Sequence, residues 1–178
     1  MIGLSDGTAP KDKTIYLGLD VALRNTGWVV NEGRRLVASG TVKTKSFKKP
    51  KGLKQAEYFD EMVKHELEQV DALGHSLADI SKTFEADMVV AELPTFAQSN
   101  ASFLGLAWSI FAGADYGKLC FVLPNEIKKI TGSKNRTSKQ DIKNVVCKKY
   151  FALMTASEHA VDAQAALIYY HAKKDGTL

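Results

Sequence analysis

Acidic residues end two short apolar runs of the sequence. Asp20 closes the run of residues 14–20, and Glu92 closes the run of residues 87–92. A buried charge without a partner strongly destabilises a fold, so an acid at the end of a buried strand needs an explanation. An ion pair or a cap is one explanation, and a site that binds cations is the other.

A third acidic segment lies near the C-terminus. His159 and Asp162 are three residues apart in an expected helix and therefore share one face. With Asp20 and Glu92 they form an oxygen-rich set that suits Mg²⁺ or Mn²⁺ better than Zn²⁺. Two such ions about 4 Å apart are suited to in-line attack of water on a phosphodiester. We therefore predict a two-metal site with Mg²⁺ as cofactor and Mn²⁺ as a substitute; alternatively, His159 is an ordinary surface residue.

Lysine and arginine are concentrated in two segments of a chain whose net charge is only +4. Residues 34–54 contain eight Lys and Arg and no acid, and residues 126–149 contain eight against two acids. The two segments therefore carry +8 and +6, which leaves −10 for the rest of the chain. Clustered cations bind phosphate backbones, so nucleic acid is the expected partner, with two merely solvated faces as the alternative.

The length of 178 residues fits one domain with a sizeable core. We expect a flexible N-terminal tail over residues 1–13 and a single domain over residues 14–173. No apolar run approaches the roughly 20 residues that span a membrane, and the tail lacks the apolar core of a signal peptide. Two cysteines, Cys120 and Cys147, are too few for a disulfide framework, which favours a cytoplasmic protein.

Short apolar runs alternate with helical patterns in an order that indicates an α/β fold. Strands are expected at residues 14–20, 27–31, 35–43, 87–92 and 118–123. Helices are expected at residues 53–84 (with a weak point at Gly74), 100–116, 124–130 and 138–151, and again after Ser157. Three successive strands followed by helix-connected strands predict a five-stranded mixed sheet, antiparallel in its first three strands, with helices on both faces.

These motifs together resemble, in order, those of the RuvC-type Holliday junction resolvases, which are nucleases of the RNase H-like superfamily. The segment 17–27 (LGLDVALRNTG) resembles the first-strand signature of the family, and residues 89–92 (VVAE) resemble its second acidic strand. The loop at residues 131–133 and the helix that begins at Ser138 resemble its basic loop and DNA-contacting helix. Residues 158–163 (EHAVDA) resemble its closing motif.

The resemblance implies an RNase H-like fold and a Mg²⁺-dependent endonuclease that resolves four-way junctions and other branched DNA, leaving 5′-phosphate and 3′-hydroxyl ends. It implies that Asp20 bridges both metal ions, that Glu92 supports one, and that His159 and Asp162 complete the site. His159 alternatively positions or deprotonates the attacking water. The DNA contacts that it implies come from Lys128, Lys129, Lys134, Arg136, Lys139 and Lys143, and from Phe96 as the nearest match to an aromatic wedge.

The resemblance also implies a homodimer, because a four-way junction presents two symmetry-related strands for incision. The uncharged helix expected at residues 100–116 is the candidate dimer surface, with core packing as the competing explanation. Val21 and Ala22 stand where the family usually has Pro-Gly, and the loop at residues 46–54 is longer than usual. The alternatives are a nuclease of the same superfamily that acts on RNA–DNA hybrids and a non-catalytic junction-binding protein. The expected location is the cytoplasm, of a host cell if the source is viral, in association with the nucleoid.

Overall fold

The strands of this protein form one mixed sheet. The computed structural model describes residues 12–48, 50–52, 54–93, 118–132 and 137–178. The strands are β1 (Ile15–Asp20), β2 (Asn25–Glu32), β3 (Arg35–Lys43), β4 (Met88–Glu92) and β5 (Lys118–Val122), in the sheet order β3-β2-β1-β4-β5. The β1–β2 and β2–β3 pairs are antiparallel, and the β1–β4 and β4–β5 pairs are parallel. The predicted sheet is confirmed.

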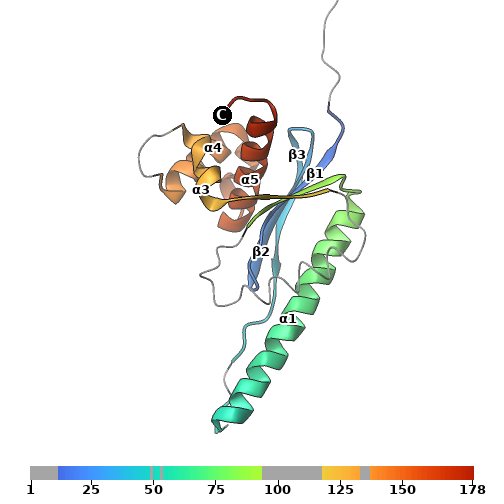
Figure 1. Cartoon of the computed structure of the whole chain (residues 1–178), viewed down its shortest axis with the longest axis vertical. Coiled ribbons are helices and arrows are strands. Elements are labelled where there is room, and N and C mark those ends of the chain that lie inside the picture. Colours follow the sequence, from blue (N-terminus) through green and yellow to red (C-terminus); the bar gives the residue numbers. More distant parts are fainter. Residues whose placement is uncertain (1–11, 49, 53, 94–117, 133–136) are drawn as a thin grey trace, which may run out of the picture.

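Helices follow the strands on both sides of this sheet (Figure 1). They are α1 (Gln55–Thr83), α3 (Pro124–Ile127), the 3-10 helix η1 (Lys128–Thr131), α4 (Lys139–Lys149), the 3-10 helix η2 (Phe151–Thr155) and α5 (Glu158–Lys174). The chain beyond residue 150 thus continues as a separate 3-10 turn, whereas one helix was expected to run to residue 151. None of the helices described has the length and apolar character needed to cross a membrane.

Each face of the sheet buries its own apolar cluster. On one face, Leu73 and Leu77 of α1 join a buried cluster with Leu17 and Leu19 of β1. On the other face, α5 contributes Leu167 and its neighbouring alanines to a second buried cluster. Alternation along the strands divides the side chains between these two layers, so the sheet is covered on both faces as predicted.

Helix α1 is continuous through Gly74, where the sequence suggested a possible break. A glycine inside a helix costs about 1 kcal/mol relative to alanine. Gly74 is buried between Leu73 and Leu77, and the burial of these neighbours against the sheet offsets that cost.

Several predictions concern residues outside the described ranges. These are the wedge candidate Phe96, the expected uncharged helix at residues 100–116 with its candidate dimer surface, and the loop residues Lys134 and Arg136. The division into a tail over residues 1–13 and a domain over residues 14–173 also stays a prediction.

Candidate functional site

Two parallel strands bring acids to the same edge of the sheet. Asp20 is the last residue of β1, and Glu92 is the last residue of β4. The strands pair in parallel up to Leu19 and Ala91, so each acid follows directly on a paired position. The carboxyl ends of parallel strands are a common place for polar sites, because they leave the sheet on the same side.

Helix α5 brings two further side chains to this edge because it packs directly on a glycine. Ser157 caps the helix by accepting a hydrogen bond from the Ala160 N–H at 3.2 Å. Gly27 pairs with Asp20 in the β1–β2 register, and a Cβ built on it would lie 2.1 Å from the carbonyl carbon and oxygen of His159. Only glycine therefore allows the first turn of α5 to approach β2 so closely.

This approach places His159 beside the first acid. The His159 Nδ1 lies 2.8 Å from the Asp20 Oδ2, within hydrogen-bond distance. The Asp20 side chain is 19 % exposed and that of His159 is 37 % exposed, so the pair lies at the surface of the fold with the acid on the inner side. Burial raises the pKa of Asp20, and the hydrogen bond from His159 opposes that rise.

Asp20 is close enough to Glu92 and Asp162 for its charge to change the protonation of both acids. Burial and then the charges of Asp20 and Asp162 raise the pKa of Glu92 to about 7. Burial and then the charge of Asp20 raise the pKa of Asp162 to about 6. Acids with raised pKa values at the edge of a sheet are typical of functional sites, although structural networks also produce them.

Lys139, the first residue of α4, supplies a cation to this acidic group. Its Nζ lies 2.6 Å from the Glu158 Oε1 and 3.7 Å from the Asp162 Oδ2. The hydrogen bond to Glu158 raises the pKa of Lys139, so the ammonium stays charged at neutral pH. The capping box of α4 fixes the start of this helix, because Ser138 and Asp141 bond to each other's backbone N–H groups.

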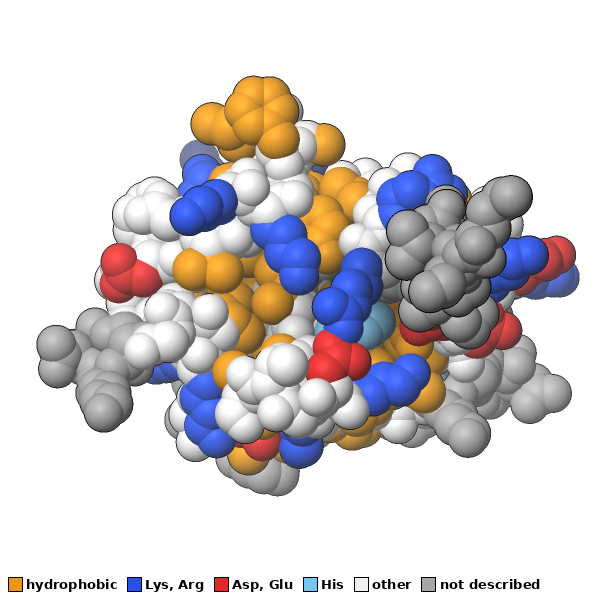
Figure 2. Space-filling model, turned by 90° about the horizontal axis from the view of Figure 1, so that it is seen from above, with side chains coloured by type: hydrophobic (Ala, Val, Ile, Leu, Met, Phe, Trp, Pro, Cys, Tyr) orange, Lys and Arg blue, Asp and Glu red, His pale blue; other side chains and the backbone are white. Residues whose placement is uncertain are grey.

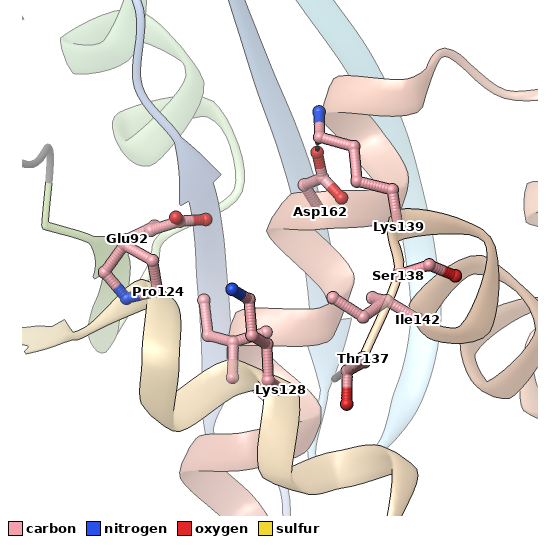
Figure 3. Close-up of a pocket in the computed structure, with 9 residues that line it drawn as sticks. Glu92, Pro124, Lys128, Thr137, Ser138, Lys139, Ile142 and Asp162 are labelled. Carbon is pink, nitrogen blue, oxygen red and sulfur yellow. Dashed lines mark ion pairs between the residues drawn. The ribbon is translucent and has the colours of Figure 1, made fainter. Parts of the chain in front are cut away.

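A cavity of about 450 Å³ opens between these elements. Figure 3 shows Glu92 and Lys128 on one side and the Lys139–Asp162 ion pair on the other. The remaining lining residues are Pro124, Ile127, Thr137, Ser138 and Ile142. Two carboxylates and two ammonium groups thus face one hollow that is open to solvent, an arrangement that can hold a cation next to a phosphate group.

Two other predicted DNA-binding lysines, Lys129 and Lys143, lie outside this lining. Lys143 is near enough to Glu158 to lower the pKa of that acid, although the hydrogen bond from Lys139 is the main cause. Lys129 lies on η1 near Glu126 and contributes to the lowered pKa of that acid. Lysine and arginine side chains also spread over the face of the molecule in Figure 2, with hydrophobic side chains exposed between them.

Glu158 is the residue that sequence reasoning did not assign to the site. It lies next to His159 and binds Lys139, but 19 residues separate the two partners and no local spacing signals the contact. Thr137 and Ser138 were likewise expected only as loop and cap residues, and both line the cavity.

The chemistry of these donors fits a hard divalent cation. The charge of Asp20 raises the pKa values of Glu92 and Asp162, so positive charge placed among these acids stabilises them, and oxygen ligands are those that Mg²⁺ and Mn²⁺ prefer. Within the ranges that the structure describes, no group of three or more His, Cys, Asp and Glu side chains is arranged to hold a metal ion as it stands. Here the Asp20 and Asp162 carboxylates contact His159 and Lys139 instead.

Comparison with solved structures identifies the fold. The chain is similar to RuvC of Thermus thermophilus in complex with a Holliday junction substrate, with a TM-score of 0.67 and 18 % identity over 92 % of this chain and 97 % of that one. A second structure of RuvC from this organism gives the same TM-score at 19 % identity, over 92 % of this chain and 98 % of that one. The yeast mitochondrial Holliday junction resolvase gives a TM-score of 0.51 at 11 % identity, over 96 % of this chain and 89 % of that one.

No family model and no curated protein matches the sequence. The likeness to the solved structures covers nearly the full length of both chains in the two comparisons with RuvC. The chain therefore has the RNase H-like fold of the RuvC-type resolvases, as the sequence motifs predicted.

Proposed function

We propose that this protein is a structure-selective DNA endonuclease that resolves four-way junctions by hydrolysing phosphodiester bonds. The observation that carries the proposal is the meeting of Asp20, Glu92, His159 and Asp162 at one sheet edge, beside two lysines. The fold supports it, because the structures it resembles include a RuvC bound to a Holliday junction substrate. The most direct rivals are a nuclease that cuts RNA–DNA hybrids and a protein that binds junctions without cutting them.

In this proposal the carboxylates of Asp20, Glu92 and Asp162 would hold two Mg²⁺ ions, for which Mn²⁺ would substitute. When bound, these ions would supply charge neutralisation at the scissile phosphate during in-line displacement. The raised pKa values of Glu92 and Asp162 make both acids partly protonated near neutral pH in the absence of metal, so binding releases protons.

The protein's own groups would orient the reaction. His159 is held through Nδ1 against Asp20, which leaves Nε2 to position the attacking water or accept its proton. The water oxygen bonds to phosphorus and the bond to the 3′ oxygen breaks, so the products are a 5′-phosphate and a 3′-hydroxyl. Lys128 and Lys139 line the cavity and would bind the phosphates that flank the scissile bond.

The proposal includes a homodimer that acts in the cytoplasm. One copy places one set of acids at one sheet edge, whereas resolution of a four-way junction requires two incisions related by symmetry. A two-fold dimer would present two such sites to the two strands.

Replacing Asp20 by Asn tests the proposal. We expect Asp20→Asn to abolish cleavage of a synthetic four-way junction in Mg²⁺ while junction binding is retained, because the variant removes a metal ligand but no phosphate-binding lysine. Asp71→Asn is the matched control, since Asp71 is also an acid paired with a histidine, His75, on the exposed face of α1. Cleavage by Asp20→Asn at the rate of the control would refute the assignment.

A further inference from the structure

The connection between β3 and α1 carries lysines that do not line the cavity. Lys43 ends β3, and Lys45, Lys48, Lys51 and Lys54 follow it along the connection; all five are exposed. No acid occurs between residues 34 and 54. In the described part of the chain none of these five lysines forms an ion pair. We call the connection that carries these five lysines the basic arm.

The basic arm is bonded to α1 rather than being a free loop. The Lys45 carbonyl accepts a hydrogen bond from the Gln69 Nε2 at 2.5 Å, and the His65 Nε2 lies 2.8 Å from the same oxygen. The Phe47 ring lies against Tyr58 and His65, with ring centroids 5.7 and 5.6 Å apart. Tyr58, His65 and Gln69 recur on one face of the helix, so the arm runs along that face and its lysines have a fixed support.

The arm leaves the sheet at the edge that carries the acids. Asp20 pairs with Gly27, and Gly27 pairs with Thr41 of β3, so Thr41 lies about 10 Å from Asp20 at a strand spacing of about 4.8 Å. Just after β3, the Thr44 N–H donates a hydrogen bond to the Arg24 carbonyl at 3.1 Å, and Arg24 is only four residues after Asp20 in the chain. The base of the arm is therefore close to the candidate active site.

From this base the arm extends away from the body of the protein. Figure 1 shows the end of β3, the connection and the first half of α1 projecting together below the sheet. The first buried residue of α1 is Gln69, so residues 55–68 extend about 21 Å at about 1.5 Å per residue. That length corresponds to roughly six base pairs of a duplex, which carries one negative charge per about 1.7 Å of its axis.

The charge distribution limits the contact to one side. The first turns of α1 carry Glu57, Asp60 and Glu61, which would repel a phosphate backbone. The lysines lie on the connection, whose inner side is bonded to Gln69 and His65. A duplex along the outer side of the connection would meet ammonium groups spaced along its backbone, which position DNA without reading its sequence.

We infer that the basic arm is a second phosphate-binding surface, separate from the cavity, that holds a DNA duplex leaving the site. The inference rests on the proposed function in one respect, namely that the bound DNA is branched. Its phosphate contacts do not depend on cleavage, so the two ideas can fail separately.

The test compares two triple variants with equal loss of charge. Lys45→Gln/Lys48→Gln/Lys51→Gln removes three positive charges of the arm. Lys13→Gln/Lys82→Gln/Lys173→Gln removes three from exposed lysines before β1 and at the C-terminal ends of α1 and α5, of which Lys173 pairs with Glu126. Binding of a four-way junction and of a linear duplex is measured by fluorescence anisotropy in EDTA across a salt series. Each lost phosphate contact should reduce the slope of log K against log salt by about 0.9, so the arm variant should lose about 2–3 in slope and at least about tenfold in affinity.

Equal losses in both triple variants would overturn the inference, because they would reflect net charge alone. An unchanged DNA affinity with altered sedimentation would also overturn it, since the arm would then contact another protein copy.

A second measurement locates the contact. From about 10 to about 30 Å from Asp20 the arm would cover roughly base pairs 3–9 of a duplex, at one charge per about 1.7 Å of axis. Neutral methylphosphonates over those base pairs of a junction arm should remove the difference between wild type and the arm variant. Methylphosphonates placed beyond about base pair 12 should leave the difference in affinity between wild type and the arm variant unchanged. If only these distant substitutions removed the difference, the contact would lie elsewhere and the inference would be contradicted. If junctions prove not to be substrates, the linear duplex still reports on the arm.

Discussion

Replacing Glu92 by Gln should stabilise the metal-free protein while destroying its activity. Burial and the charges of Asp20 and Asp162 raise the pKa of Glu92 from 4.5 to about 7. The folded state then binds more protons than the unfolded state between these two pH values, so stability falls as the pH rises through that window and stays lower above it. The ionised Glu92 thus opposes folding at pH 8.

The magnitude follows from the size of the pKa change. A tenfold change in proton affinity corresponds to about 1.4 kcal/mol, which sets a ceiling of roughly 3 kcal/mol for Glu92. Glu92 is only partly buried, and solvent screening reduces the expected gain of Glu92→Gln to about 1–2 kcal/mol at pH 8. The gain should shrink as the pH falls toward 5, where the wild-type acid is protonated.

Urea denaturation in EDTA at pH 8 and pH 5 measures this gain. Glu126→Gln is the matched control, because hydrogen bonds from the Leu123 N–H and the Tyr169 hydroxyl lower the pKa of Glu126, so loss of its charge should destabilise the fold. Adding Mg²⁺ should stabilise the wild type more than Glu92→Gln and so reduce the difference between their free energies of unfolding. A Glu92→Gln protein that is no more stable than wild type in EDTA at pH 8 would show that burial and the neighbouring acids do not raise the pKa of Glu92 as described.

Three further predictions follow from single contacts. Lys128→Ala should reduce the salt slope of junction binding by about 1, whereas Lys82→Ala, far from the cavity, should not; equal slopes for the two would remove Lys128 from the DNA surface. Gly27→Ala should push the first turn of α5 off β2, because the added Cβ would overlap the His159 carbonyl. We expect the free energy of unfolding in urea to fall by at least about 2 kcal/mol and most of the cleavage activity to be lost. A stable, active variant would contradict the close packing. Burial lowers the pKa of His171 from 6.5 to about 4, so the unfolded state takes up this proton at a higher pH than the folded state does. The free energy of unfolding should therefore fall as the pH drops from 6.5 to 4. Measured by thermal or urea unfolding, that fall should be about 2 kcal/mol smaller in His171→Phe than in wild type.

Most of the expected strands could be predicted from the sequence because they are short apolar runs with a clear turn signal, whereas residues 35–43 alternate loosely. The strand at residues 35–43 has the same bounds in the structure, and the acids Asp20 and Glu92 end their strands as expected. Local sequence also predicted the capping residue Ser138, because capping involves atoms only three residues apart.

The contacts that complete the site could not be predicted in the same way. The Lys139–Glu158 ion pair and the packing of His159 on Gly27 join residues far apart in the chain, and no spacing encodes them. The length of α1 was also uncertain at Gly74, because burial of its neighbours against the sheet is a tertiary effect. The projection of the basic arm depends on hydrogen bonds from Gln69 and His65, which the charge pattern alone does not reveal.

The central claim is that the acids at this sheet edge cut branched DNA. The most direct measurement incubates the protein with end-labelled substrates, with and without Mg²⁺: a four-way junction, a Y-fork, a flap, an RNA–DNA hybrid and a linear duplex. We predict Mg²⁺-dependent, symmetrically placed nicks in the four-way junction, with 5′-phosphate ends that a ligase can reseal, and no cutting of the linear duplex. Efficient cutting of the hybrid alone, or binding of the junction with no incision in Mg²⁺ or Mn²⁺, would contradict it.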